Sequence, residues 1–257
     1  MLLALDIGNT EITGGLFAGT DLVAQWRFTT VHERTPDEWA ALFLAYLAHS
    51  GRTPGTVRAA VIGSVAPTVA MDLAAGIQLA CGVTPVDVGP SSPLPITLDV
   101  DEPLTVGADR VVNTLAAHAL FARDTVVVDF GTATTFDCIS AKGDYIGGVI
   151  VPGISISLEA LVQMASKLPR VEIVRPRTVI GKNTVHGMQS GILYGYVSLV
   201  DGMVDRIRKE MGEDAFVIAT GGLAERVAPE SHTIQEVDEF LTLKGLQILH
   251  QLNRKEA

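Results

Sequence analysis

The chain has 257 residues, of which 47% are hydrophobic and 19% are charged, with 25 glycines, 12 prolines and two cysteines. This composition excludes disordered, collagen-like and disulfide-stapled proteins and is typical of an ordered globular chain with a sizeable core. The formal net charge of -10 opposes a general role in binding nucleic acid, which depends on clustered lysine and arginine.

The first residues do not have the pattern of a secretion signal. The run Leu2–Leu5 is apolar, but Asp6 interrupts it before a hydrophobic region of about 7 to 15 residues can form. No apolar run approaches the roughly 18 residues that span a bilayer. Together with the low cysteine count, this pattern leads us to expect a cytoplasmic protein without a membrane partner.

A β-hairpin is predicted at the start of the chain. Leu2–Leu5 has the pattern of a buried strand, Asp6–Thr10 that of a turn, and Ile12–Phe17 that of a second strand. A capping box and helical spacing predict the next element, and further strand and helix patterns follow it. These elements are a helix at 35–49, a strand at 58–63 and a helix that begins at 66–67.

The opening hairpin recurs 123 residues later, where 125–128 is again an apolar strand followed by a polar turn. Identical residues fall on turn positions in the same register. They are Asp6 and Asp129, Gly8 and Gly131, Ala18 and Ala141, and Asp21 and Asp144. Chance is the alternative explanation of these identities, but their place at structurally demanding turns favours a duplicated hairpin and two related lobes.

The second half repeats the order of elements seen in the first. Helices are predicted at 153–166 and 185–211, with a strand at 216–219 and a turn at 220–222. We therefore expect an α/β fold in which mixed sheets are flanked by helices. The expected lobes are residues 1–115 and residues 116–257, without a flexible linker between them.

Three glycines lie on one face of the predicted helix 185–211. Gly187, Gly191 and Gly195 recur at four-residue intervals, and each costs about 1 kcal/mol relative to alanine inside a helix. Something therefore approaches the helix backbone there. Two interpretations stay open, close packing within the chain and a dimer interface.

The turn Asp6–Thr10 combines a carboxylate, a glycine that exposes main-chain N–H groups and two side chains that can donate to an anion. This set suits a phosphate group with hydrated magnesium held by Asp6. The alternative, a structural Asx-type turn, does not explain a charged residue at the end of a buried strand. Thr132 is the corresponding donor of the second turn, so one turn from each lobe is expected to hold a triphosphate.

Two further stretches are candidates for ligand contacts. In Thr220–Gly222, the glycines would let a base and ribose lie against the main chain, although a plain turn is equally compatible with them. In Gly107–Arg110, a helix N-terminus offers amides to an anion, Arg110 a guanidinium for a carboxylate, and Asp109 a carboxylate that can accept a proton. The alternative for this stretch is an ordinary N-cap aspartate followed by a solvated arginine.

Five motifs have the order and spacing of the type III pantothenate kinases, and the resemblance covers essentially the whole chain. They are Asp6-Ile7-Gly8-Asn9-Thr10, Gly107-Ala108-Asp109-Arg110 and the segments 128–133, 147–153 and 181–184. That family belongs to the superfamily of acetate and sugar kinases, heat-shock chaperones and actin. The resemblance therefore implies duplicated ribonuclease H-like lobes of the actin-like ATPase fold, in agreement with the internal repeat.

The resemblance also implies roles for individual residues. Asp109 matches the catalytic proton acceptor, Thr132 a second phosphate contact, and Asp129 a ligand of a monovalent cation, potassium or ammonium. The match to the ATP phosphate loop comprises Asp6, Ile7, Gly8, Asn9, Thr10, Glu11, Ile12 and Thr13, and Gly221 and Gly222 are added to the ATP site from the pattern above. The match to the pantothenate site comprises Gly107, Ala108, Asp109, Arg110 and, from the other subunit of a homodimer, Thr184.

One position departs from the family pattern. Many members have a tyrosine beside the substrate where this chain has Val100, although some share an apolar residue there, so the tyrosine's contact is missing. The implied activity is ATP-dependent phosphorylation of pantothenate to 4'-phosphopantothenate, the first step of coenzyme A biosynthesis. Two alternatives stay open, a kinase of another small hydroxy compound and a non-catalytic accessory factor in transcription.

Overall fold

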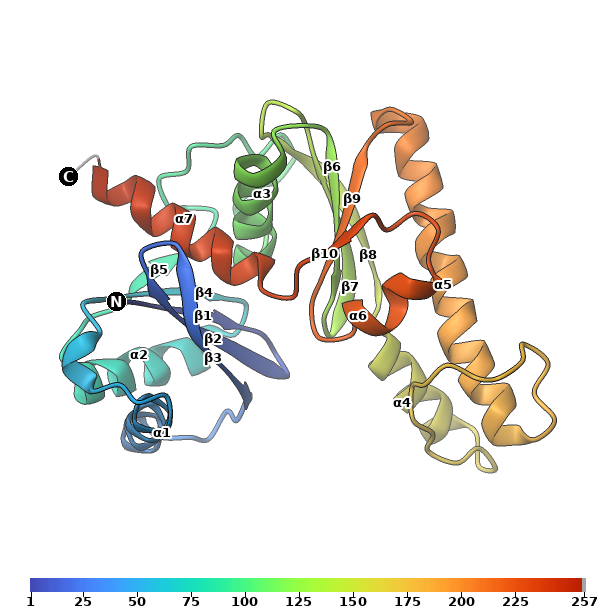
Figure 1. The fold of residues 1–257 in the computed structure, drawn as a ribbon, viewed down its shortest axis with the longest axis horizontal. Helices are drawn as coiled ribbons and strands as arrows, with labels where there is room; N and C mark the ends of the chain where they lie inside the picture. Colours follow the sequence, from blue (N-terminus) through green and yellow to red (C-terminus); the bar gives the residue numbers. More distant parts are fainter. Residues whose placement is uncertain (256–257) are drawn as a thin grey trace. The chain divides into compact units, whose positions relative to one another are not determined.

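The computed structural model describes residues 1–255, which form two compact units (Figure 1). The first unit comprises residues 1–116 together with the last helix of the chain, and the second comprises residues 117–240. Each unit contains one five-stranded sheet. Within the described part of the chain, every helix is too short or too polar to cross a bilayer.

The sheet of the first unit has the strand order β3-β2-β1-β4-β5. The first three strands pair antiparallel, whereas β4 runs parallel to β1 and β5 runs parallel to β4. The strands are β1 (Leu2–Ile7), β2 (Glu11–Ala18), β3 (Asp21–Thr29), β4 (Ala59–Ser64) and β5 (Val86–Val88). The helices are α1 (Pro36–His49), α2 (Pro67–Cys81), α3 (Ala108–Phe121, of which the part up to residue 116 lies in this unit) and α7 (Leu241–Lys255), with 3-10 turns at Pro54–Thr56 and Pro103–Thr105.

The capping box predicted for α1 is present. The Thr35 hydroxyl accepts a hydrogen bond from the Glu38 main-chain N–H at 3.4 Å, and the Glu38 carboxylate accepts one from the Thr35 N–H at 2.8 Å. This reciprocal pair fixes the start of the helix. Trp39, Phe43 and Leu47 then fall on the face of α1 that packs against the sheet.

The sheet of the second unit repeats this topology, with the order β10-β9-β6-β7-β8. Strands β6, β7 and β8 pair antiparallel, β9 runs parallel to β6, and β10 runs parallel to β9. The strands are β6 (Thr125–Phe130), β7 (Ala133–Ile139), β8 (Tyr145–Pro152), β9 (Phe216–Thr220) and β10 (Glu236–Val237). The helices are α4 (Ile154–Met164), α5 (Thr184–Met211) and α6 (Ala224–Val227), with a 3-10 turn at Ala228–Glu230.

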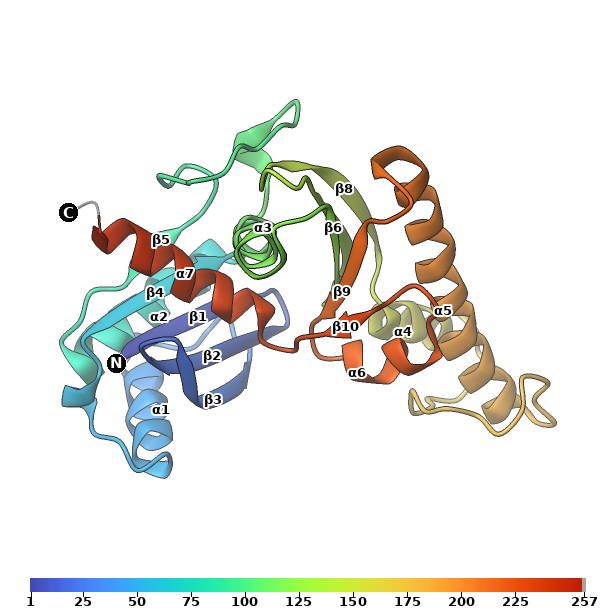
Figure 2. The ribbon, with the colours of Figure 1, turned by 45° about the horizontal axis from the view of Figure 1, so that its top comes forward.

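The two sheets confirm the duplicated arrangement predicted from the hairpin repeat. Strands β1 and β6 occupy corresponding places and share one burial pattern, in which only the fifth residue is less than fully buried. That residue is Asp6 in β1 and Asp129 in β6. Figure 1 and Figure 2 show α5 along one face of the second sheet, where it closes the core of that unit.

The last helix differs from the sequence-based division, which assigned residues 116–257 to the second lobe. In the structure α1 and α2 cover one face of the first sheet, and α7 packs against the opposite face (Figure 2). Two glycines make room for it. A side chain on Gly15 would come within 2.8 Å of Leu243, and one on Gly63 within 3.2 Å of Leu246. This long-range fit has no local sequence signal.

A buried carboxylate fastens the segment after α6 to helix α5. Asp201 accepts hydrogen bonds from the hydroxyls of Ser231 (2.5 Å) and Thr233 (2.7 Å), and Nδ1 of the His232 ring lies 2.8 Å from its other oxygen. Burial alone would raise the pKa of Asp201, but the hydrogen bonds from Ser231, Thr233 and the His232 main chain, together with the His232 charge, hold this pKa below its ordinary value. Asp201 is therefore a stabilising anion at neutral pH.

We expect Asp201→Asn to lower the free energy of unfolding by about 1–3 kcal/mol at about pH 7, because hydrogen bonds to a charged acceptor are lost. Since the folded pKa lies below the unfolded value of about 3.9, the contribution is fully present above that value and disappears as the pH falls through the folded pKa. Urea unfolding followed by circular dichroism at about pH 7 and about pH 3 measures the difference. Glu210→Gln, which changes an exposed acid near the end of the same helix, is the control. An equal loss at both pH values would contradict this account.

Candidate functional site

The first acidic turn joins β1 to β2 and depends on a glycine. The Gly8 N–H donates to the Glu11 carbonyl at 3.0 Å, and a side chain on Gly8 would lie 2.8 Å from that oxygen. Thr30, just after β3, holds the turn from the side, because its hydroxyl donates to the Gly8 carbonyl at 2.8 Å. The close approach explains why this turn requires glycine.

The residues predicted for the ATP phosphate loop do not all present side chains to solvent. Asn9, Thr10 and Glu11 are exposed, and Asp6, Gly8 and Thr13 are partly buried. Ile7 and Ile12 are fully buried in the core, so only their main-chain groups can meet a ligand. If the turn binds phosphate as the sequence predicts, the contacts must come from main-chain groups and from the polar side chains of the exposed residues.

The sequence did not predict a positively charged side chain beside this turn. Arg27 on β3 lies opposite Thr13 in the strand register, and its guanidinium contacts the Glu11 carboxylate at 2.6 Å. The Glu11 carboxylate, next to the exposed turn, therefore has a positively charged partner. The local signal for this contact is the alternating pattern of β3. It places the Arg27 side chain on one face of the sheet, where it can reach a residue of the neighbouring strand β2.

Asp6 and the N-terminus of α3 lie on the same face of the first sheet. Leu5 and Ile7 point into the core that α1 and α2 cover, so Asp6, between them, points to the opposite face. Gly63 lies beside Asp6 in the parallel register, and a side chain on Gly63 would lie 3.8 Å from Cβ of Ala108, the first residue of α3. The acidic turn and the Gly107–Arg110 motif therefore share one side of the sheet, within one unit.

Asp109 is held inside the first turn of α3. One of its carboxylate oxygens accepts a hydrogen bond from the Arg110 main-chain N–H at 2.9 Å. Burial raises the pKa of Asp109, against the opposing effects of that hydrogen bond and of the Arg110 charge. The helix begins at Ala108, so Asp109 is not the N-cap residue of the alternative interpretation. A carboxylate with a raised pKa is a stronger proton acceptor.

The other predicted substrate contacts lie in different units. Val100 is in the irregular segment between β5 and the 3-10 turn at Pro103–Thr105, in the first unit, and is partly buried. Thr184 is the first residue of α5, in the second unit, and is exposed. The neighbouring Asn183 caps this helix by accepting a hydrogen bond from the His186 N–H at 2.9 Å.

The second acidic turn brings together several residues that the sequence predicted separately. The Gly153 N–H donates to the Thr132 carbonyl at 3.1 Å, so the start of α4 is fixed on the turn after β6. Gly221 has φ +88°, and a side chain there would lie 2.6 Å from Oδ1 of Asp129 and 2.8 Å from the main chain of Phe130. Asp129, Thr132 and Gly221 therefore lie together in the second unit, where the neighbouring strands β6 and β9 end.

A buried hydroxyl beside Asp129 was missed by the sequence analysis, which treated Thr220 only as part of a turn. Thr220 pairs with Asp129 in the parallel register of β9 and β6, and Thr135 of β7 lies opposite Asp129 on the other side. The Thr220 residue is 1% exposed, and its hydroxyl has no hydrogen-bond partner. An unsatisfied buried hydroxyl costs about 1–3 kcal/mol, which a bound cation would offset.

The donor set around Asp129 suits a weakly bound hard cation. Among residues 1–255 there is no group of three or more histidine, cysteine, aspartate or glutamate side chains that could hold a metal ion. One carboxylate with neighbouring neutral oxygens is the kind of site that alkali cations accept, whereas transition metals prefer nitrogen and sulfur ligands. Asp6 likewise offers a single carboxylate, which suits magnesium that keeps several waters.

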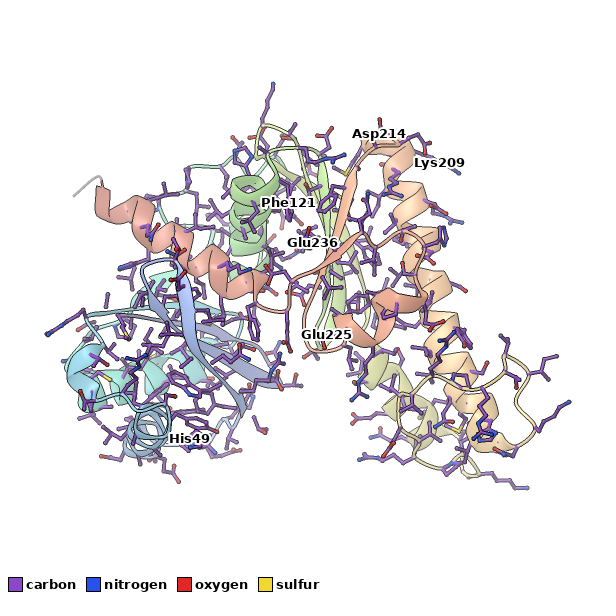
Figure 3. All side chains as sticks on the ribbon, in the orientation of Figure 1. His49, Phe121, Lys209, Asp214, Glu225 and Glu236 are labelled. Atoms are coloured by element: carbon purple, nitrogen blue, oxygen red, sulfur yellow. The ribbon has the colours of Figure 1, made fainter. Side chains whose placement is uncertain are left out.

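A pocket of about 530 Å³ lies within the second unit. It is formed by one face of α4, the segment 170–174 and the start of α6, where Leu223 and Arg226 line it. Figure 3 labels Glu225 on α6 and Glu236 on β10, which mark the two segments that follow β9 in this unit. Leu223 directly follows the predicted Gly221–Gly222 turn, so the pocket adjoins that turn.

Comparison with known proteins decides the family. The family model described as type III pantothenate kinase matches residues 2–206. A type III pantothenate kinase of Pelobacter propionicus is 50% identical over 254 residues, which are 99% of this chain and 100% of the relative. The chain belongs to the type III pantothenate kinase family.

Solved structures show the fold of this family member. A putative Baf family transcriptional activator of Campylobacter jejuni is 19% identical, with a TM-score of 0.62 and coverage of 98% of this chain and 99% of that one. The activator of the 2-hydroxyisocaproyl-CoA dehydratase of Clostridium difficile, solved with bound ADPNP, is 12% identical, with a TM-score of 0.59 and coverage of 100% and 97%. At these identities the likeness concerns the fold alone, the actin-like ATPase fold.

Proposed function

We propose that this chain transfers the γ-phosphoryl group of ATP to the primary hydroxyl of pantothenate, which gives 4'-phosphopantothenate in the first step of coenzyme A biosynthesis. Membership of the type III pantothenate kinase family is the observation that carries the proposal. Cys81 and Cys138 are not joined in a disulfide, which is consistent with a reducing compartment, and we place the reaction in the cytoplasm.

The acceptor hydroxyl must lose its proton as its oxygen bonds to the γ-phosphorus and ADP leaves. Asp109 is the proton acceptor in our proposal, because burial raises its pKa towards the range where a general base is effective. Arg110, next to it, supplies the positive charge that a substrate carboxylate requires, and the first amides of α3 add hydrogen-bond donors. Most of the rate enhancement in phosphoryl transfer comes from such positioning and charge stabilisation.

The phosphates of ATP are assigned to the two acidic turns. In the first unit, the side chains of Asn9 and Thr10 are exposed beside the turn that the Gly8–Glu11 hydrogen bond closes, and they can donate to phosphate oxygens. In the second unit, Thr132 is the corresponding donor. Magnesium, held through water by Asp6, supplies positive charge against the phosphate oxygens.

The monovalent cation is assigned to Asp129. The carboxylate of Asp129 and the Thr220 hydroxyl lie on paired positions of neighbouring strands, and the hydroxyl has no protein partner. Potassium or ammonium bound there would satisfy the buried hydroxyl and supply charge near the phosphate turn of the same unit.

We expect Asp109→Asn to lower kcat by about two orders of magnitude or more, since the amide cannot accept the proton. Binding of ADP should remain unchanged, because no phosphate contact is removed, and the thermal midpoint should not fall, because an unfavourably buried charge is lost. Steady-state kinetics with pantothenate, and equilibrium binding of ADP, measure the two effects. Asp37→Asn, an exposed acid on α1, is the matched control.

The pH dependence of the same reaction gives a second readout of this prediction. A base with a raised pKa loses activity as the pH falls through that pKa, so the acid limb of kcat/KM should lie above the ordinary carboxyl value of about 3.9. An Asp109→Asn variant that retains wild-type kcat would rule out this role.

Thr220→Val should lose most of the response to potassium. The variant removes a buried, unsatisfied hydroxyl, so we expect it to be at least as stable as the wild type in sodium buffer. The rise of the thermal midpoint on adding potassium should shrink, and the potassium concentration for half-maximal activity should increase about tenfold. Thr220→Ser, which keeps the hydroxyl, should behave like the wild type. A full potassium-dependent rise in Thr220→Val would contradict the assignment.

We also propose a homodimer formed through α5, to which Thr184 contributes its predicted substrate contact. Gly187, Gly191 and Gly195 are exposed on this helix, and a side chain on any of them would meet nothing within 4 Å. Packing within the chain, the other interpretation of these glycines, therefore does not account for them. A glycine stripe on an exposed helix lets a second backbone approach closely.

Gly191→Arg tests this dimer. Arginine has a higher helix propensity than glycine by about 1 kcal/mol and has free space here, so the folded chain itself should tolerate the change. We expect the variant to sediment as a monomer and to bind pantothenate more weakly, with its thermal midpoint retained. Gly55→Arg, an equally open glycine in the first unit, is the control. A dimeric Gly191→Arg variant would contradict the proposal.

A further inference from the structure

We propose that Arg27 of β3 is a further catalytic residue, whose guanidinium contacts oxygens of the γ-phosphoryl group during its transfer. This inference rests on the proposed function, because it concerns the phosphoryl group of the same reaction. It gives a role to a positively charged side chain that lies outside the five motifs of the sequence.

Strand register places Arg27 in one row with the aspartate of the first acidic turn. Arg27 lies opposite Thr13 of β2, and Thr13 lies opposite Asp6 of β1. Residues that pair across neighbouring strands have their side chains on the same face of a sheet. The three side chains therefore share the face opposite the core that α1 and α2 cover, and a guanidinium, a hydroxyl and a carboxylate follow one another across it.

The same row continues towards the substrate motif. Gly63 of β4 is the partner of Asp6 in the parallel register, and a side chain on Gly63 would lie 3.8 Å from Cβ of Ala108. Ala108 is the first residue of α3, and the predicted proton acceptor Asp109 follows it. Within the first unit, Asp6 therefore lies between Arg27 and the start of this helix. A phosphoryl group beside Asp6 would have the acceptor hydroxyl on one side and Arg27 on the other.

The Arg27 side chain lies over this face of the sheet rather than in open solvent. Strand β3 is at the edge of its sheet, yet only 33% of the Arg27 side chain is exposed. Its guanidinium contacts the carboxylate of Glu11, the first residue of β2, at 2.6 Å. A guanidinium has five N–H donors, so Arg27 can keep this contact and still donate to a phosphate oxygen. The ion pair therefore holds the positive charge beside the turn before a nucleotide binds.

Negative charge at the first turn explains why a phosphoryl group there needs this cation. Asp6 and Glu11 both place carboxylates beside the turn, and carboxylates repel phosphate oxygens. During phosphoryl transfer, charge is spread over the three equatorial oxygens of the transferred group. A planar guanidinium offers parallel N–H donors to two such oxygens at once, whereas the ammonium of a lysine acts as a point charge. Arg27 is therefore suited to stabilise the transition state.

The test separates this role from that of a purely structural ion pair with Glu11. Arg27→Gln removes the charge, Arg27→Lys keeps the charge without the parallel donors, and Glu11→Gln removes the ion pair but keeps the guanidinium. Arg58→Gln, which changes an exposed arginine just before β4, is the matched control. Equilibrium dialysis of each variant with magnesium and either ADP or β,γ-imido-ATP measures the contribution of the γ-phosphoryl group to binding.

We expect Arg27→Gln to bind β,γ-imido-ATP about tenfold more weakly than Arg58→Gln does, and to bind ADP equally well. The kcat with pantothenate should fall by about 100-fold or more, because the guanidinium acts on charge in the transition state, and Arg27→Lys should recover only part of this loss. Glu11→Gln should bind β,γ-imido-ATP at least as tightly as the wild type, because a repelling carboxylate is removed. The thermal midpoint of Arg27→Gln should stay close to that of the wild type, since a partly exposed ion pair adds little stability.

An unchanged preference for β,γ-imido-ATP over ADP in Arg27→Gln would overturn the inference. An equal loss of that preference in Glu11→Gln would also overturn it, because the ion pair alone would then account for the effect. The dialysis measurements do not require turnover. If the wild type does not phosphorylate pantothenate but Arg27→Gln still loses affinity for β,γ-imido-ATP alone, the proposed acceptor is wrong and the contact of Arg27 with the γ-phosphoryl group is supported.

Discussion

A single carboxylate at the end of a buried strand is the constraint around which each unit is arranged. In β1 and in β6 all residues but one are buried. The exception, at the fifth position, is an aspartate, Asp6 in β1 and Asp129 in β6. A partly buried carboxylate beside a phosphate-binding turn is unfavourable unless a cation neutralises it. The net charge of -10 also means that the protein has no surplus of positive side chains to neutralise these carboxylates. We propose that bound cations neutralise both aspartates.

Main-chain proximity gives these turns their shape. Gly8 is required by the carbonyl of Glu11, and Gly221 by the carboxylate of Asp129. Each glycine leaves room for an oxygen atom, a carbonyl in one case and a carboxylate in the other, where a side chain would clash. The buried Thr220 hydroxyl is a further polar group of the second turn. It lies next to Asp129 in the strand register and has no hydrogen-bond partner in the protein. An unsatisfied buried hydroxyl lowers stability, and a cation bound there would offset this cost.

Local patterns in the sequence were enough to predict the hairpins, the capping box of α1 and the repeat that makes the two sheets alike. The place of α7 was not predictable in this way, because it depends on the fit of Leu243 and Leu246 against glycines more than 180 residues away. Thr220 and Arg27 were missed for a related reason, since only strand register reveals their neighbours. The predicted motif residues lie at strand ends, on turns and at helix starts. The burial of Ile7 and Ile12 limits these two residues to main-chain contacts.

This member of the family phosphorylates pantothenate with ATP, and we propose that a monovalent cation at Asp129 takes part. The most direct measurement is mass spectrometric detection of the product after incubation with ATP, magnesium and pantothenate, once with potassium and once with sodium as the only monovalent cation. We predict 4'-phosphopantothenate with potassium and little or none with sodium. ATP hydrolysis without a phosphorylated pantothenate product, or equal product with either cation, would contradict this account.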